Sequence, residues 1–285
     1  MPVLPKSKYT VSEDKHKYTI IMDDGNKIGP LKSVTGILRI LAKEALIGWA
    51  AKESANFFKT EILRMGRGAL NAETLDAIAE QAKGAHRRIA KDAADLGTAC
   101  HAIFEAIMQG REPDQIPPEL AEPAKDFKRW RLGTDIELVG FETPVASIQY
   151  AYGGRVDAVG YSKSRGGFGI VDYKTSSSLL YGNEYSYQVG GYAKAFEEQY
   201  GVVAAWAEII RFGKKPPYDS EARPVADLDT AKAGFALLAQ VSKFEESKLI
   251  GEPSFSTAPE RTAEAIAKAE TDKKKKAKAE PAVGF

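Results

Sequence analysis

The first half of the chain is predicted to be mainly helical, because its apolar positions recur every three to four residues. A β-rich run at residues 17–22 and the turn signal Asp24-Gly25-Asn26 predict an N-terminal hairpin within residues 1–32. Ser33 is a suitable N-cap for the helix that follows. Helices are expected from residue 33 past residue 58, and over residues 72–90, 96–108 and 119–131.

The pattern changes near residue 136, where runs of β-rich residues begin. Residues 136–141, 154–161 and 168–173 are expected to form an antiparallel meander. A helix (185–199), a strand (204–212), a weaker strand (222–225) and a helix (229–249) follow. Strands that alternate with helices in this way favour an α/β (α+β) fold, with a central mixed sheet flanked by helices and a helical N-terminal half.

Composition limits the possible classes of protein. The 40 Lys+Arg residues nearly balance the 39 Asp+Glu residues, so any surface for nucleic acid must be local. A single cysteine excludes an internal disulfide, a four-cysteine zinc site and a four-cysteine iron–sulfur cluster. There is no apolar run of membrane-spanning or signal-peptide length, which predicts a cytoplasmic protein with no membrane association. Residues 33–256 are expected to form one domain, followed by a disordered Lys/Ala/Glu-rich tail at 257–285.

Charged residues cluster at the ends of two of the predicted strands. Asp172 and Lys174 lie two apart and so share one face of a strand, and a hairpin would bring Asp157 beside Asp172. Two carboxylates suit Mg²⁺ or Mn²⁺, and a lysine beside the ion can position a water molecule. An Asp-x-Lys on a strand is often only a solvated edge, but the apolar Ile170-Val171 before it indicates a buried strand.

Two helices carry further candidates. Gln188 and Tyr192 are four apart and share a face with Tyr185, although a helix with an aromatic core stripe explains the pattern equally well. His101 and Glu105 are one turn apart, and Gly97 lies one turn before them. A lone histidine on a helix is more often structural than a metal ligand.

Together these residues resemble the PD-(D/E)XK nuclease superfamily, and within it the RecB-like exonuclease branch, which includes phage exonucleases and the mitochondrial genome maintenance exonuclease. Four matching pieces occur in the family's order: Gly97-x-x-x-His101, Gly154-Arg155-Val156-Asp157, Asp172-Tyr173-Lys174-Thr175 and Gln188-x-x-x-Tyr192. The resemblance covers residues 96–212 and implies a restriction-endonuclease-like core. The proline of the motif name is absent before Asp157.

The resemblance also implies roles for individual residues. His101, Asp157, Asp172 and the backbone carbonyl of Tyr173 would bind Mg²⁺ or Mn²⁺, and Lys174 would be the catalytic lysine. Gln188 and Tyr192 would support the site or contact DNA, while Glu142 and Glu105 would have support roles only. Arg155, Thr175, Ser176 and Tyr185 are predicted to contact DNA. Neither an iron–sulfur cluster nor a bound nucleotide is expected, since the cluster cysteines and the nucleotide-binding loop are absent.

The expected function is therefore that of a metal-dependent DNA exonuclease, which hydrolyses phosphodiester bonds from an end of linear DNA in recombination, repair or phage DNA processing. A structure-selective endonuclease has the same kind of active site. A non-catalytic DNA-binding module of the same fold is a further alternative, although such a protein would be expected to lose Lys174 or one of the aspartates. The similarity to phage members implies a single-strand annealing or binding protein as a partner.

Overall fold

The computed structural model describes residues 2–41, 44–66, 70–109, 111, 113, 115–175, 179, 183–213, 218 and 220–245. These residues belong to one compact unit, residues 1–245. The predicted tail and Ser176 lie outside the described residues. The predicted division into domains at residues 32 and 256 stays a prediction.

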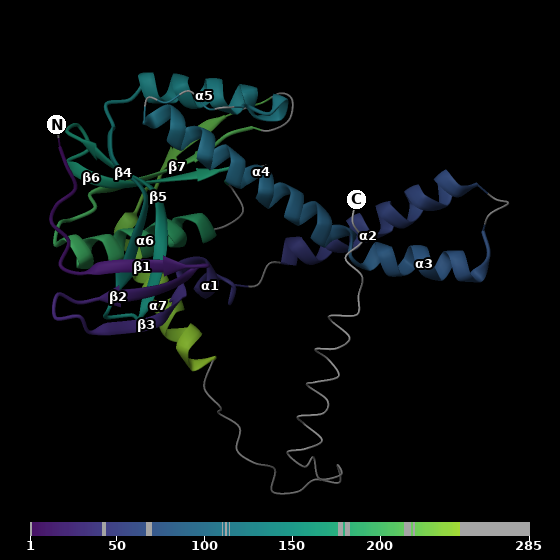
Figure 1. The fold of residues 1–285 in the computed structure, drawn as a ribbon, viewed down its shortest axis with the longest axis horizontal. Coiled ribbons are helices and arrows are strands. Elements are labelled where there is room, and N and C mark those ends of the chain that lie inside the picture. The colour runs from purple at the N-terminus through teal and green to yellow at the C-terminus, as the bar shows by residue number, and fades with distance from the viewer. Residues whose placement is uncertain are drawn as a thin grey trace, which may run out of the picture. The chain divides into compact units, whose positions relative to one another are not determined.

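The fold is a mixed α/β structure with an eight-stranded mixed sheet and a helical N-terminal half, as the sequence predicted (Figure 1). The strands are β1 (Thr10–Asp14), β2 (Lys17–Ile21), β3 (Lys27–Ser33), β4 (Glu137–Ser147), β5 (Tyr152–Ser162), β6 (Gly167–Lys174), β7 (Trp206–Arg211) and β8 (Glu221–Pro224). The helices are α1 (Val34–Leu38), α2 (Glu44–Met65), α3 (Ala72–Lys83), α4 (Ala85–Met108), α5 (Ala121–Leu132), α6 (Glu184–Tyr200) and α7 (Leu228–Phe244), and a 3-10 turn at Pro118–Leu120 precedes α5.

The sheet runs in the order β1-β2-β3-β5-β6-β7-β8, and β4 also pairs with β5. The predicted meander is confirmed, since β4 and β6 both pair antiparallel with β5. The N-terminal strands join the same sheet, because β3 pairs in parallel with β5. Residues 10–33 form three strands, one more than the predicted hairpin, and β4 extends six residues beyond the predicted end at 141.

Helices cover both faces of the sheet and enclose two apolar cores. One core joins α1, α6 and α7 to the sheet and includes Ile170 and Phe235. The other joins α4 and α5 to the opposite face and includes Val171 and Phe104. Ile170 and Val171 are consecutive in β6 and enter different cores, as expected for a strand buried on both faces.

Two predicted helix boundaries are wrong. The helix that begins at Ser33, whose hydroxyl accepts a hydrogen bond from the Gly36 N–H at 2.9 Å, ends at Leu38, and α2 is a separate helix. These two helices have different neighbours, since α1 packs on α6 whereas α2 packs on α3 and α4. The predicted breaks near 90 and 96 are replaced by one break at Gly84, after which α4 runs unbroken to Met108.

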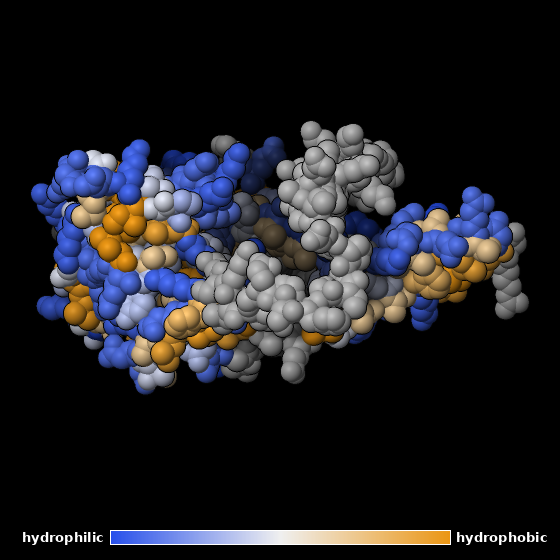
Figure 2. All heavy atoms as spheres, turned by 90° about the horizontal axis from the view of Figure 1, so that it is seen from below, coloured by the Kyte–Doolittle hydropathy of each residue, from blue (hydrophilic) through white to orange (hydrophobic). Residues whose placement is uncertain are grey.

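The hairpin of α2 and α3 has no fully buried residue in the described part of α2. Apolar side chains gather on its surface (Figure 2). Leu46, Ile47 and Leu63 of α2 are exposed. Ile78 and Ala82 of α3 are its buried apolar contacts. Packing in this hairpin therefore comes from one layer of helices, unlike the two-sided core of the sheet.

Candidate metal centre

The candidate site lies where the central sheet divides. The ladder between β5 and β6 ends at the pair Ala158–Val171, while β3 pairs with β5 only at Tyr152 and Gly153. Between these ladders, the described part of β5 has no strand partner on that side. Asp157 is the first residue of this opening, and Asp172 is its counterpart on β6. The division of the sheet thus brings two carboxylates to the place where backbone pairing stops.

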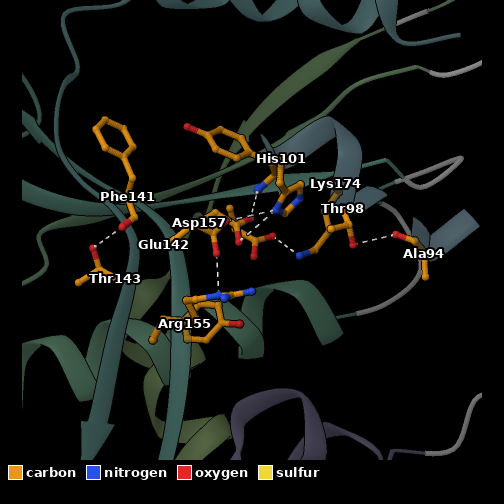
Figure 3. A network of polar contacts seen from close by, with 12 residues as sticks. Ala94, Thr98, His101, Phe141, Glu142, Thr143, Arg155, Asp157 and Lys174 are labelled. Carbon is orange, nitrogen blue, oxygen red and sulfur yellow. Dashed lines mark hydrogen bonds and ion pairs between the residues drawn. The ribbon is translucent and has the colours of Figure 1, made fainter. Parts of the chain in front are cut away.

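Three side chains from three elements converge at this opening (Figure 3). Nδ1 of His101 in α4 lies 3.7 Å from Oδ1 of Asp157 in β5 and 3.8 Å from Oε1 of Glu142 in β4. Each residue offers one ligand atom, and the three atoms lie within 4.8 Å of one another. An imidazole and two carboxylates form a donor set that suits a divalent cation.

The space beside this cluster is small. A cavity of about 10 Å³ is lined by the three residues together with Phe104, Glu105, Phe141 and Tyr173. That volume corresponds to about one water-sized sphere. The residues therefore fit a single ion or water molecule better than a larger cofactor.

The electrostatics of the cluster favour a bound cation. Burial raises the pKa of Asp157 to about 6, and the negative charge of Asp172 adds to this effect. Burial lowers the pKa of His101, but the carboxylate of Glu142 and the charge of Asp157 outweigh burial, so that the pKa is raised overall. Burial and the charge of Asp172 thus disfavour the ionised form of Asp157, while the nearby carboxylates favour the protonated form of His101. A divalent cation would stabilise the carboxylates in their charged form.

A second network lies against the first on the α6 side. Asp172 is fully buried, and its Oδ2 forms an ion pair with Nζ of Lys174. Nε2 of Gln188 donates to Oδ1 of Asp172 at 3.3 Å and to the hydroxyl of Tyr192 at 3.0 Å. The sequence motifs Asp-x-Lys and Gln-x-x-x-Tyr therefore form one connected group behind the cluster.

Lys174 is held in its charged form. Burial lowers the pKa of Lys174, but the carboxylates of Asp172 and Asp157 outweigh burial and raise the pKa overall. Its Nζ also lies 5.2 Å from the ring centre of Tyr185, which places a cation over an aromatic face. Lys174 is accordingly a proton donor or a source of positive charge, and not a free base near neutral pH.

The remaining predicted residues lie around these two networks. Arg155 forms an ion pair with Glu142, and Thr175 lies against Gly97 of α4. Glu105 lines the small cavity and accepts a hydrogen bond from Gln109 at 2.9 Å. None of these observations tests contact with DNA, which stays a prediction. The backbone N–H of Tyr173 donates to Oδ2 of Asp157 at 2.7 Å, while the ligand roles predicted for Asp172 and for the Tyr173 carbonyl stay predictions.

Glu142 lies closer to the candidate site than its sequence context predicts. It was expected to have a support role, yet it belongs to the three-residue cluster, whereas Asp172 does not. Its backbone has a φ of 42°, in the left-handed region that few residues other than glycine adopt. Strained backbone of this kind is common at functional sites. The surrounding sequence pattern, however, does not predict a left-handed conformation at this position.

A larger hollow of about 820 Å³ lies elsewhere, between β7, α7 and the turn of the β5–β6 hairpin. It shares no residue with the cluster. Its buried carboxylate, Glu208, is paired with Arg165 and accepts a hydrogen bond from the Trp130 indole at 2.9 Å. The three candidate metal ligands thus lie at the small cavity and not at this larger hollow.

Comparison with known proteins gives only distant similarities. No protein-family model matches the chain, and no curated protein matches it. Among solved structures, it is similar to the one described as the crystal structure of SSO0001, with 15% identity and a TM-score of 0.34 over 60% of this chain and 68% of the other. It is also similar to an alkaline exonuclease from Laribacter hongkongensis, with 14% identity and a TM-score of 0.30 over 65% of this chain and 87% of the other. These values do not identify a family for the chain. In the part of the chain that the structure describes, no helix is long and apolar enough to cross a membrane.

Proposed function

We propose that the protein is a divalent-metal-dependent deoxyribonuclease of the PD-(D/E)XK type, acting as an exonuclease on linear DNA. The observation that carries this proposal is the convergence of His101, Glu142 and Asp157 beside the buried Lys174–Asp172 pair. A group of metal-ligand side chains next to a charged lysine provides the functional groups needed to hydrolyse a phosphodiester bond.

In this proposal His101, Glu142 and Asp157 hold the cation, with Asp172 and the Tyr173 carbonyl as further predicted ligands. The carbonyl lies on the same edge of β6 as the Tyr173 N–H, which already faces Asp157. When bound, Mg²⁺ or Mn²⁺ would neutralise charge on the scissile phosphate and make a water molecule more acidic.

Lys174 would act on the reacting phosphate through its permanent charge. Because its ammonium stays protonated, it can donate a hydrogen bond to the attacking water or to a phosphate oxygen and stabilise the charge that develops there. Gln188 and Tyr192 would keep Asp172, and through it Lys174, in place. Thr175, Ser176 and Tyr185 are proposed DNA contacts, as the sequence predicts.

The test uses two DNAs, one linear and end-labelled and one covalently closed, with Mg²⁺ or Mn²⁺. Lys174→Ala and EDTA are the negative controls. Lys163→Ala is the matched surface control, since this exposed lysine lies in the turn at the far end of β6. Degradation of the linear DNA alone, lost in both negative controls, is the expected result.

Other outcomes distinguish the alternatives. Cutting of the closed circle would assign an endonuclease activity instead. Binding without cleavage of either DNA would contradict catalysis and favour a DNA-binding module. The proposed partner, a single-strand annealing or binding protein, follows from the family resemblance alone.

A further inference from the structure

Arg155 contacts carboxylates from two different strands. Its Nε lies 2.6 Å from Oε2 of Glu142 in β4, and its Nη1 lies 3.7 Å from Oε2 of Glu13 in β1. The Arg155 side chain is 44% exposed, whereas those of Glu142 and Glu13 are 29% and 16% exposed. The guanidinium therefore connects β1 to Glu142, which is one of the three candidate metal ligands.

The two oxygens of Glu142 have different neighbours. Oε2 faces Arg155, and Oε1 faces Nδ1 of His101 at 3.8 Å (Figure 3). The left-handed backbone at Glu142 needs surrounding contacts to hold it. The ion pair with Arg155 supplies such a contact on the side opposite the cluster.

We propose that Arg155 is a positioning residue: it holds Oε2 of Glu142 so that Oε1 is presented to the cation, and Glu13 in turn holds Arg155. This role rests on the proposed metal site. It differs from direct contact with a DNA phosphate, because a positioning residue acts on the cation through Glu142. Mutating a residue that hydrogen-bonds to a metal ligand commonly lowers metal affinity by about 10- to 100-fold.

The test is the affinity for Mn²⁺, measured by calorimetry without DNA, in the full-length protein and its Arg155→Met, Arg155→Lys and Glu13→Gln variants. Removing a positive charge beside a cation site strengthens binding if only Coulomb attraction matters. Positioning predicts the opposite sign. We expect Arg155→Met to weaken Mn²⁺ binding at least tenfold, and Arg155→Lys to recover part of the loss, since a lysine keeps the charge but not the planar fork.

Two further readouts keep the outcomes distinct. The rise in melting temperature on adding Mn²⁺ should shrink in Arg155→Met, whereas a merely structural role would lower the melting temperature with and without Mn²⁺ and leave the rise unchanged. Unchanged or tighter Mn²⁺ binding in Arg155→Met would overturn the positioning role, and weaker DNA binding alone would assign Arg155 to DNA. Absence of Mn²⁺ binding in the unmodified protein would instead overturn the metal site, and this role with it.

A different observation concerns the face of α4 that presents His101. Spacings of four and three residues place five side chains on this face: Arg87, Lys91, Ala94, Thr98 and His101. Residues 87–95 are all exposed, and the Thr98 hydroxyl donates to the Ala94 carbonyl of its own helix at 3.1 Å. Small side chains, Ala94 and Thr98, therefore lie next to His101 on this face, and the cationic side chains of Arg87 and Lys91 lie farther along the helix.

Arg87 and Lys91 form no ion pair with any described residue. The neighbouring Arg88, by contrast, donates to the Gln81 carbonyl at 3.0 Å and lies over the Phe57 ring. At about 1.5 Å per residue, Lys91 lies ~15 Å and Arg87 ~21 Å along the helix from His101. Asp95 flanks this face on one side, and the small residues Ala90 and Gly97 flank it on the other.

We also propose that this face of α4 binds the phosphate backbone of the DNA strand that leads to the cluster, which again rests on the proposed function. Arg87→Ala/Lys91→Ala should weaken binding to labelled DNA in EDTA and reduce the salt slope of log K by about one to two. The Mn²⁺ affinity should stay unchanged, and Lys163→Ala should match the unmodified protein. An unchanged salt slope in the double variant would overturn this surface, whereas a lack of DNA binding by the unmodified protein would overturn the proposed function.

Discussion

Oδ2 of Asp157 accepts a hydrogen bond from the backbone N–H of Tyr173 at 2.7 Å, at the point where β6 leaves β5. A side chain thus replaces the backbone partner that the ladder no longer supplies. The bond fixes one oxygen of Asp157 and leaves the other, Oδ1, to face His101. The end of the β5–β6 ladder therefore determines how the candidate ligand Asp157 is oriented.

The raised pKa of Asp157 predicts that Asp157→Asn stabilises the metal-free protein above pH 7. A carboxyl whose pKa is about 6 in the fold and 3.8 otherwise contributes stability below pH 4, which is lost as the pH rises through 6. Asparagine avoids this loss and can still accept the Tyr173 N–H. We expect a gain on the order of 1–3 kcal/mol at pH 8 in EDTA and almost none at pH 3. An equal loss of stability at both pH values, measured by urea unfolding, would refute this explanation.

The affinity for Mn²⁺ should fall as the pH is lowered below 7. His101 has a raised pKa and must lose its proton to bind, and Asp157 begins to gain a proton near pH 6. Two protons then compete with the cation, so the affinity should fall up to 100-fold per pH unit below pH 6. His101→Gln binds more weakly but should show a slope of one proton. An affinity that does not change between pH 5.5 and 8 would contradict the assigned ligands.

The buried pair of Lys174 and Asp172 should be strongly coupled in stability. Lys174→Met leaves a fully buried carboxylate without its cation, which should cost about 3–5 kcal/mol at pH 8. Asp172→Asn should suppress much of this cost in the double variant. A double-mutant cycle from urea unfolding measures the coupling, and additive effects of the two changes would show that the ion pair is weak.

The contact between α6 and α7 depends on Gly190. A Cβ on Gly190 would lie 2.5 Å from backbone atoms of Ala231, which cannot move away without separating the helices. Gly190→Ala should therefore destabilise the protein by about 1–3 kcal/mol. Gly48→Ala in α2 is the matched control, because nothing lies within 4 Å of its added Cβ, and it should stabilise by about 0.5–1 kcal/mol. Equal effects on the melting temperature would show that packing at Gly190 is loose.

The sequence predicted the meander and its charged residues because both depend on local pattern. Alternation along β6 places Asp172 and Lys174 on one face, and the hairpin register brings Asp157 to the same end of the sheet. The same strand pattern could not predict that Glu142 is a candidate metal ligand. Its side chain reaches His101 through a left-handed backbone, and a strand pattern carries no signal for that conformation.

The continuity of α4 was also beyond the sequence pattern. Residues 87–95 are exposed on all sides, so no apolar stripe marks them as part of one helix. The end of α1 at Leu38 likewise reflects its packing on α6, which lies about 150 residues farther along the chain. Long-range contacts of this kind fix element boundaries that local periodicity leaves undetermined.

The central claim is that the cation held by His101, Glu142 and Asp157 is the one that DNA hydrolysis requires. The most direct test titrates Mn²⁺ into the protein and follows, in the same samples, metal occupancy and the degradation of end-labelled linear DNA. We predict that cleavage rises with occupancy at a single apparent Kd, and that Asp157→Asn loses both together. Cleavage that persists in EDTA, or full occupancy without any cleavage, would contradict the claim.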